Sequence, residues 1–191
     1  MNRKVLGLIA MICSPAMFAE VVISDSPVVV GIASMLFMAG SFCSLLGLWQ
    51  LKATGSSKWG RGVLILQMVL VSMAFLFGLF EATQIFAPDN ILFIVTDIAW
   101  PLSMFTMTLV GVTTAVVGSL PGWRRYGVLP SGLVMITSLL ASVVLGTPID
   151  APGFVAASVT ALSICWFTMA FTVFSSDAGE FGSRGLIGKT A

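Results

Sequence analysis

Residues 76–107, LFGLFEATQIFAPDNILFIVTDIAWPLSMFTM, decide how this chain folds. Two apolar segments flank the turn sequence APDN (87–90), and this pattern predicts two antiparallel helices. Glu81 lies eight residues before Asp89, and Asp97 lies eight residues after it. An antiparallel hairpin would therefore hold both carboxyls at similar depth. Ionisable groups inside an apolar bundle are costly and generally serve a function, so we expect the functional site here.

The composition of the whole chain indicates a membrane protein. Of its 191 residues, 58% are hydrophobic and 9% are charged, and the mean hydropathy is +1.06. A soluble domain carries roughly 25% charged residues, so this chain cannot cover a globular surface with polar groups. We predict an all-α polytopic membrane protein whose first partner is the lipid bilayer. The net charge of +1 and the lack of a dense basic patch argue against a nucleic-acid partner.

The apolar stretches predict one transmembrane domain, residues 1–176, and a flexible cytoplasmic tail, residues 177–191. Each stretch has the roughly 20 residues that a helix needs to cross a bilayer. The first stretch resembles a signal peptide, but its apolar character continues through Ile23, so we interpret it as a transmembrane helix. The six predicted helices cover residues 5–23, 28–51, 62–86, 91–118, 126–146 and 153–175.

The basic residues predict the orientation of this bundle. Six helices place all nine Lys and Arg residues on one side of the membrane, next to Trp49, Trp59 and Trp123. By the positive-inside rule that side is cytoplasmic, and both termini lie there. The nine are Arg3, Lys4, Lys52, Lys58, Arg61, Arg124, Arg125, Arg184 and Lys189.

Glu81 is the first candidate for a ligand- or proton-binding group. At helical spacing it shares one face with Gly78, Ala74 and Gln67. Small residues on that face let a neighbouring helix approach closely. We therefore expect the Glu81 carboxyl to point into the bundle, with Gln67 further along the same face.

Asp97 is the second candidate, because Pro101 follows it by four residues. Proline has no N–H to bond the carbonyl of residue i−4 and disturbs the helix there. Asp97 would then offer a carboxyl and a free backbone oxygen at a kink, and Trp100 would form a wall of the cavity. Irregular helices with spare carbonyls are a recurring way to bind cations and protons in membranes.

Glu20 is a weaker candidate, since it lies about one turn from its predicted helix end. It would more simply reach the headgroups as an interfacial residue. With every Lys and Arg on the cytoplasmic side, Glu81 and Asp97 have no predicted counter-cation. They are protonated, share a proton or await a cationic ligand. Alternatively, each carboxyl only donates a hydrogen bond that ties helices together.

Several chemistries are excluded by the residues that the sequence lacks. The chain has no histidine, which excludes His-ligated haem, zinc or copper. No lysine lies inside a predicted helix, and there is no P-loop or G-x-S-x-G motif. We predict no cofactor and no metal. Cys13, Cys43 and Cys165 lie in apolar segments and are interpreted as free buried thiols.

Three segments carry a resemblance to known proteins: FGLFEATQIF (77–86), TDIAWPLSMF (96–105) and GWRRYGVLPSGL (122–133). Together they resemble small uncharacterised bacterial inner-membrane proteins with several spans. The resemblance implies a multi-pass protein of the bacterial inner membrane and supplies no activity.

Three functions follow from these observations. In the first, an acidic cavity open to the outer side binds or transports a small cationic or amphipathic ligand, or protons. In the second, the protein is a membrane-embedded acid–base enzyme that acts on an isoprenoid or lipid. In the third, it is a structural accessory subunit of a larger membrane complex. A membrane-protein partner or a second copy of the chain is compatible with all three.

Overall fold

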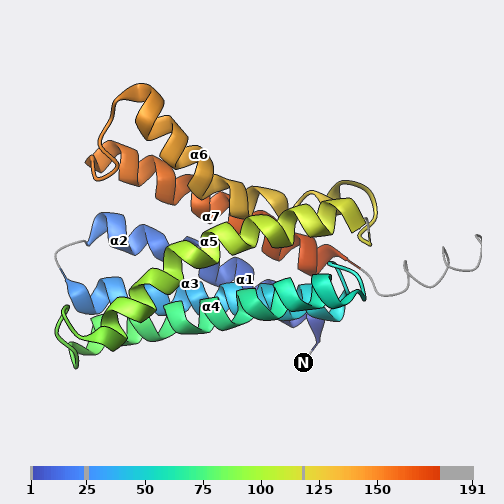
Figure 1. The fold of residues 1–191 in the computed structure, drawn as a ribbon, viewed down its shortest axis with the longest axis horizontal. Coiled ribbons are helices and arrows are strands. Elements are labelled where there is room, and N and C mark those ends of the chain that lie inside the picture. Colours follow the sequence, from blue (N-terminus) through green and yellow to red (C-terminus); the bar gives the residue numbers. More distant parts are fainter. Residues whose placement is uncertain (1, 24–25, 118, 177–191) are drawn as a thin grey trace, which may run out of the picture.

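The computed structural model describes residues 2–23, 26–117 and 119–176. This part of the chain is all-helical (Figure 1). Its elements are α1 (Arg3–Cys13), the 3-10 turn η1 (Ser14–Met17), α2 (Phe18–Val22), α3 (Pro27–Gln50), α4 (Lys58–Thr83), α5 (Ile91–Val117), the 3-10 turn η2 (Gly122–Arg125), α6 (Leu129–Leu145) and α7 (Pro152–Ser175). The predicted tail, residues 177–191, lies outside the described residues.

The long helices have the length and composition of membrane spans. Within the described chain, α3, α4, α5 and α7 are each long and apolar enough to cross a membrane. Helix α6 is apolar but has 17 residues, which gives a length of about 25 Å. Many large apolar side chains are exposed on the surface of the bundle, and those of Val143 and Val144 are 80% and 81% exposed. Exposed apolar area of this extent indicates an apolar surrounding.

The first predicted helix, residues 5–23, is not continuous. It is divided into α1, η1 and α2, with Pro15 inside the 3-10 turn. Proline has no N–H to continue an α-helix, and its ring clashes with the preceding turn. The Ser14 hydroxyl donates to the Ala10 carbonyl at 2.7 Å where α1 ends. Apolar character alone therefore overestimated the continuity of this segment.

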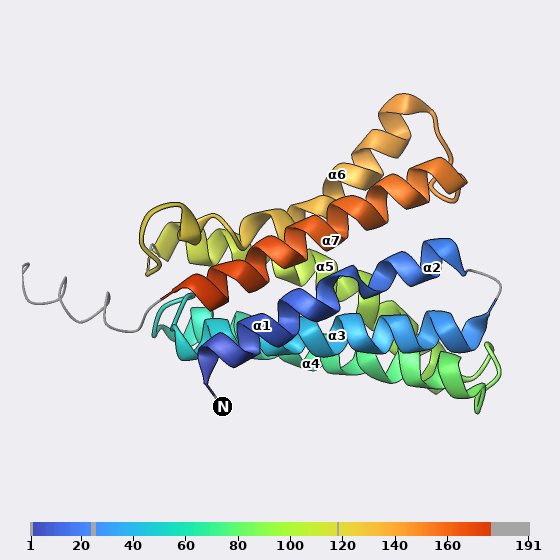
Figure 2. The ribbon, with the colours of Figure 1, turned by 180° about the vertical axis from the view of Figure 1, so that it is seen from behind.

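The six apolar segments form a ring, with α1, η1 and α2 counted as one segment. Each segment packs on the next in the order α3, α4, α5, α6, α7 and α1, and α1 packs on α3 to close the ring (Figures 1 and 2). Consecutive helices therefore form adjacent walls of one bundle. Residues far apart in sequence can meet at its centre.

Glycines allow close approach at two of these helix contacts. A Cβ added to Gly31 in α3 would lie 2.6 Å from the Gly78 carbonyl oxygen in α4, and also against the Ala82 backbone. A Cβ on Gly132 in α6 would meet the α5 backbone at Thr108. Small residues at such contacts let helices pack through their backbones. The predicted small-residue face around Gly78 is thus confirmed.

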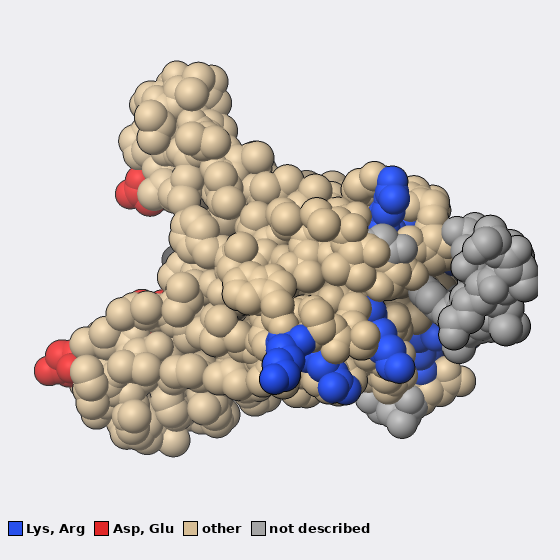
Figure 3. All heavy atoms as spheres, turned by 45° about the vertical axis from the view of Figure 1, so that its right-hand side comes forward, with Lys and Arg blue, Asp and Glu red and all other residues tan. Residues whose placement is uncertain are grey.

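The interior of the ring is packed at its centre and at one end. Gly47 of α3 lies against Val173 of α7, and the Phe37 ring meets the Trp166 ring edge-on at 5.4 Å. The side chains of Phe37 and Trp166 are buried. The described Lys and Arg residues lie at this end, where α1 and α4 begin and α3 ends, away from the Asp and Glu side chains that are visible in Figure 3. Asp89 and Asp150 belong to the turns at the other end, between α4 and α5 and between α6 and α7. The sequence prediction of charge segregation therefore holds for the described residues.

Candidate functional site

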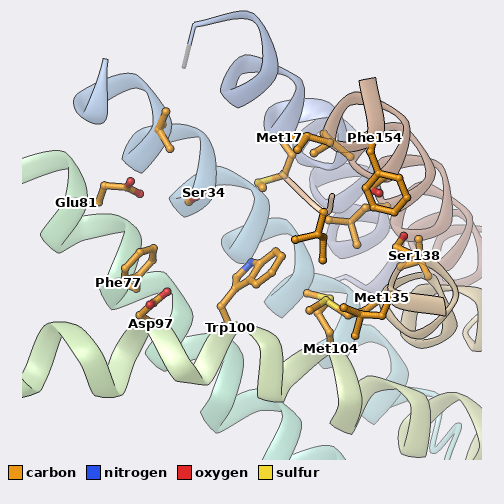
Figure 4. A pocket seen from close by; sticks show the side chains of 18 residues that line it. Met17, Ser34, Phe77, Glu81, Asp97, Trp100, Met104, Met135, Ser138 and Phe154 are labelled. Atoms are coloured by element: carbon orange, nitrogen blue, oxygen red, sulfur yellow. The ribbon is translucent and has the colours of Figure 1, made fainter. Parts of the chain in front are cut away.

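A cavity of about 430 Å³ opens at the end of the ring away from the Lys and Arg residues. All six segments contribute to its lining, from Met17 in η1 to Leu162 in α7. Ser34 and Leu162 of its lining lie about one helical turn before Phe37 and Trp166, the packed pair in the centre of the ring. Figure 4 shows the side chains that line this cavity.

Two predicted carboxyl residues come together on one wall of the cavity. Glu81 projects from α4 and Asp97 from α5, on the same side of the space (Figure 4). Trp100 lies on α5 one turn after Asp97, and its indole extends toward the middle of the cavity. The Asp97 side chain is exposed, whereas Glu81 and Trp100 are partly buried. The structure thus unites three of the predicted site residues.

The turn between α4 and α5 is built by local hydrogen bonds and ring contacts. Gln84 adopts a left-handed conformation with φ 53°, and its side-chain amide donates to the Glu81 carbonyl at 2.7 Å. The Asn90 side chain accepts from the Leu92 N–H at 2.9 Å at the start of α5. Below the turn, the Phe77 and Phe93 rings pack edge-on at 5.1 Å. These contacts hold the two helices in an antiparallel hairpin, as predicted.

The two carboxyls nevertheless lie at different positions along their helices. Helix α4 ends at Thr83 rather than at the predicted residue 86, because Gln84 leaves the helical conformation. Glu81 is then two residues, about 3 Å, from the end of its helix. Asp97 is six residues, about 9 Å, past the start of α5 at Ile91. Measured from the helix ends, the predicted similar depth is therefore replaced by a rim carboxyl, Glu81, and a deeper one, Asp97.

Pro101, Gln67 and Glu20 are the other three predicted site residues, and the first two do not line the cavity. Pro101 lies inside α5, which continues to Val117, and it does not line the cavity. Its missing N–H still leaves the Asp97 carbonyl without the usual helical donor. Gln67 is fully buried in α4 and lies outside the cavity lining, 14 residues or about 21 Å from Glu81. The backbone of Glu20 lies in α2, but its side chain is not described.

The opposite wall of the cavity is apolar and was not predicted. Met135 of α6 and Phe154 of α7 line it (Figure 4). Leu139 and Val155 of the same two helices also line the cavity. The apolar residues of these two helices do not by themselves indicate which face turns inward. One polar signal was available: Ser131, Ser138 and Ser142 are spaced by seven and four residues along one face of α6, and Ser138 lines the cavity.

Alpha helices 6 and 7 are joined by one such serine. The Ser131 hydroxyl donates to the Cys165 carbonyl of α7 at 3.0 Å. Because this bond crosses between two helices, it holds the apolar wall together below the cavity.

The cavity combines negative groups with an apolar surface. Its described lining includes two carboxyl residues and no Lys or Arg. No group of three or more His, Cys, Asp or Glu residues that could hold a metal ion occurs in the described parts of the chain. No protein-family model, curated protein or solved structure matches this chain.

Proposed function

We propose that this protein binds a small cationic, amphipathic ligand in the cavity between α4, α5, α6 and α7. The observation that carries the proposal is the division of one cavity into a carboxyl wall and an apolar wall without a basic residue. A carboxylate stabilises a nearby cation, and no Lys or Arg is among the described residues that line this cavity. An apolar wall favours the hydrocarbon part of the same molecule.

The aromatic residue between the two walls supports this ligand class. The Trp100 indole extends between the acidic and the apolar side chains (Figure 4). A cation over an indole face gains about 0.5–2 kcal/mol, more when it is desolvated. The volume of about 430 Å³ falls in the range of small-molecule sites. An alkylammonium ion would place its head between Asp97 and Trp100 and its chain against Met135.

We further propose that the six segments span the bacterial inner membrane with both termini in the cytoplasm. The support is the separation of the described Lys and Arg residues from Asp89 and Asp150, together with the positive-inside rule. The cavity would then open to the outer side. Asp89→Cys and Lys58→Cys, each made in a chain whose Cys13, Cys43 and Cys165 are replaced by serine, test this with a membrane-impermeant thiol reagent. Intact cells should label only the Asp89→Cys variant.

Binding of octyltrimethylammonium to the purified protein, measured by calorimetry below its micelle concentration, tests the ligand class. We expect Asp97→Asn and Glu81→Gln each to weaken binding, by about tenfold or 1.4 kcal/mol for Asp97→Asn. Asp89→Asn and Asp150→Asn are matched controls, because both acids lie in turns outside the cavity lining. Octanol and octyl sulfate should bind more weakly than the cation. Equal affinity for all three ligands would contradict the proposal.

Transport is a separate measurement on the same variants. Proteoliposomes that accumulate the cation, or lose a pH gradient when it is added, would assign movement as well as binding. Loss of stability in Glu81→Gln and Asp97→Asn, without any binding by the wild type, would instead favour the accessory-subunit function.

A further inference from the structure

A second, smaller hollow of about 130 Å³ lies at the Lys and Arg end of the bundle. It is formed where α3 ends, where the connecting loop turns and where α4 begins. Its lining consists of Trp49, Lys52, Thr54, Gly55, Ser56, Arg61 and Leu64. The larger cavity shares none of these residues, so the hollow is a separate feature.

The charge of this hollow is uncompensated within the described part of the chain. Lys52 and Arg61 both line it, and no Asp or Glu does. The described Asp and Glu side chains belong to the opposite half of the bundle: Glu81, Asp89, Asp97 and Asp150. Two cations around one small space repel each other, and an anion between them would remove that repulsion.

Arg61 is held in place by its neighbours. Its guanidinium carbon lies 5.6 Å from the centroid of the Trp49 ring. Ser57 caps α4 by accepting from the Gly60 N–H at 3.1 Å, and a Cβ on Gly60 would meet the Thr54 carbonyl. The start of α4 is therefore packed on the loop that lines the hollow. A guanidinium stacked on an indole keeps its N–H edge free for the oxygens of a phosphate.

We propose that this hollow binds a phosphate group, either of a lipid headgroup or of a soluble phosphate. Arg61 supplies a planar pair of donors and Lys52 a second positive charge. The hydroxyls of Thr54 and Ser56 are further donors on the lining. The hollow is too small for a large organic ligand, so the phosphate is recognised and the rest of the molecule extends outward.

The surface beside the hollow favours the lipid source. Ile65 and Val69 follow Arg61 at four-residue spacing along one face of α4, and their side chains are 50% and 51% exposed. A lipid whose phosphate lay between Lys52 and Arg61 could lay its acyl chains on this apolar face. A soluble phosphate would gain nothing from it.

Native mass spectrometry of the full chain in nonionic detergent tests the site. The probes are dioctanoylphosphatidylglycerol, inorganic phosphate and, as an apolar control, dioctanoylglycerol. We expect the Lys52→Gln/Arg61→Gln double variant to bind the phosphate probe at least tenfold more weakly than wild type. Arg125→Gln is the matched control, because the Arg125 guanidinium carbon also lies over a ring, 4.5 Å from the Tyr126 centroid, but outside the hollow. Its binding should equal that of wild type.

A comparison of the lipid probe with inorganic phosphate identifies which kind of phosphate group the hollow binds. Binding of the lipid without binding of inorganic phosphate assigns a headgroup site, and comparable binding of both assigns a soluble phosphate. The conservative Arg61→Lys variant, which keeps the charge, should retain more binding than Arg61→Gln and shows that a folded site is being measured. The proposal is overturned if neither phosphate probe binds, or if Arg125→Gln weakens binding as much as the double variant. Because the cation site lies at the other end, failure of either proposal leaves the other standing.

Discussion

Replacing Gly31 with alanine should separate α3 from α4 and disturb the carboxyl wall of the cavity. The added Cβ would lie 2.6 Å from the Gly78 carbonyl oxygen, whereas ordinary contact begins at about 3.4 Å. The two backbones must therefore move apart by at least 3.4 − 2.6 = 0.8 Å at this point, because the contact with the Ala82 nitrogen is closer still. No flexible side chain takes up the overlap, since the nearest atoms belong to the backbone of Gly78 and Ala82. Ala82 is the neighbour of Glu81, so the rim carboxyl moves with it.

The expected change in the free energy of unfolding has two opposing contributions, overpacking and helix propensity. Overpacking a close contact costs about 1–3 kcal/mol. An alanine is a better helix former than glycine by about 1 kcal/mol, which offsets part of that cost. Gly62→Ala in α4 separates the two terms, because a Cβ there has no heavy atom within 4 Å. We therefore expect Gly31→Ala to be less stable than Gly62→Ala by about 1–3 kcal/mol.

The measurement is reversible unfolding in mixed micelles with increasing dodecyl sulfate, followed by far-UV circular dichroism. Calorimetry with octyltrimethylammonium then reports whether the shift of α4 reaches the cavity, with weaker binding expected in Gly31→Ala only. The reasoning is refuted if Gly31→Ala is as stable as Gly62→Ala and binds the cation with the affinity of the wild type.

Three further outcomes are expected. Gln67→Met should leave cation binding unchanged and stabilise the fold by about 1–3 kcal/mol, because the buried amide oxygen and nitrogen of Gln67 have no hydrogen-bond partner among the described residues. Unfolding in dodecyl sulfate measures the change in stability. A large loss of stability would show that the amide is paired. Ser131→Ala should destabilise the fold by about 0.5–1.5 kcal/mol through loss of its bond to the Cys165 carbonyl; Ser72→Ala, which removes only a bond within one exposed turn, is the control in the same assay. Trp100→Phe should retain more cation affinity than Trp100→Leu in calorimetry, because phenylalanine keeps an aromatic face; equal losses would argue against a cation–π contribution.

The amino-acid sequence by itself determined the features that depend on local chemistry. A bilayer leaves no water for backbone groups, so runs of about 20 apolar residues must become helices. That constraint predicted the positions of α3, α5 and α7 closely, the turn at residues 87–90 and the segregation of the described Lys and Arg residues. It also placed Glu81, Asp97 and Trp100 near one another, because a short hairpin leaves little freedom for residues beside its turn.

Single residues within the apolar runs also affect where helices end, but the prediction followed the apolar character of the whole run. Pro15 divides the first segment, and the left-handed Gln84 ends α4 before the predicted residue 86. The second difference moved Glu81 to the rim of the cavity. Both depend on one or two residues within an apolar run, where a periodicity of many residues carries little information about the exact end of a helix.

Only the tertiary structure decided which side chains share the cavity with the two carboxyls. Gln67 lies on the predicted face of α4 but far from the cavity, whereas Met135 and Phe154 of α6 and α7 complete it. The order of helices in the ring and the rotation of each helix are set by backbone contacts such as that between Gly31 and Gly78. These contacts join residues that are distant in sequence. The sequence of a uniformly apolar helix does not indicate which of its faces a neighbouring helix will cover.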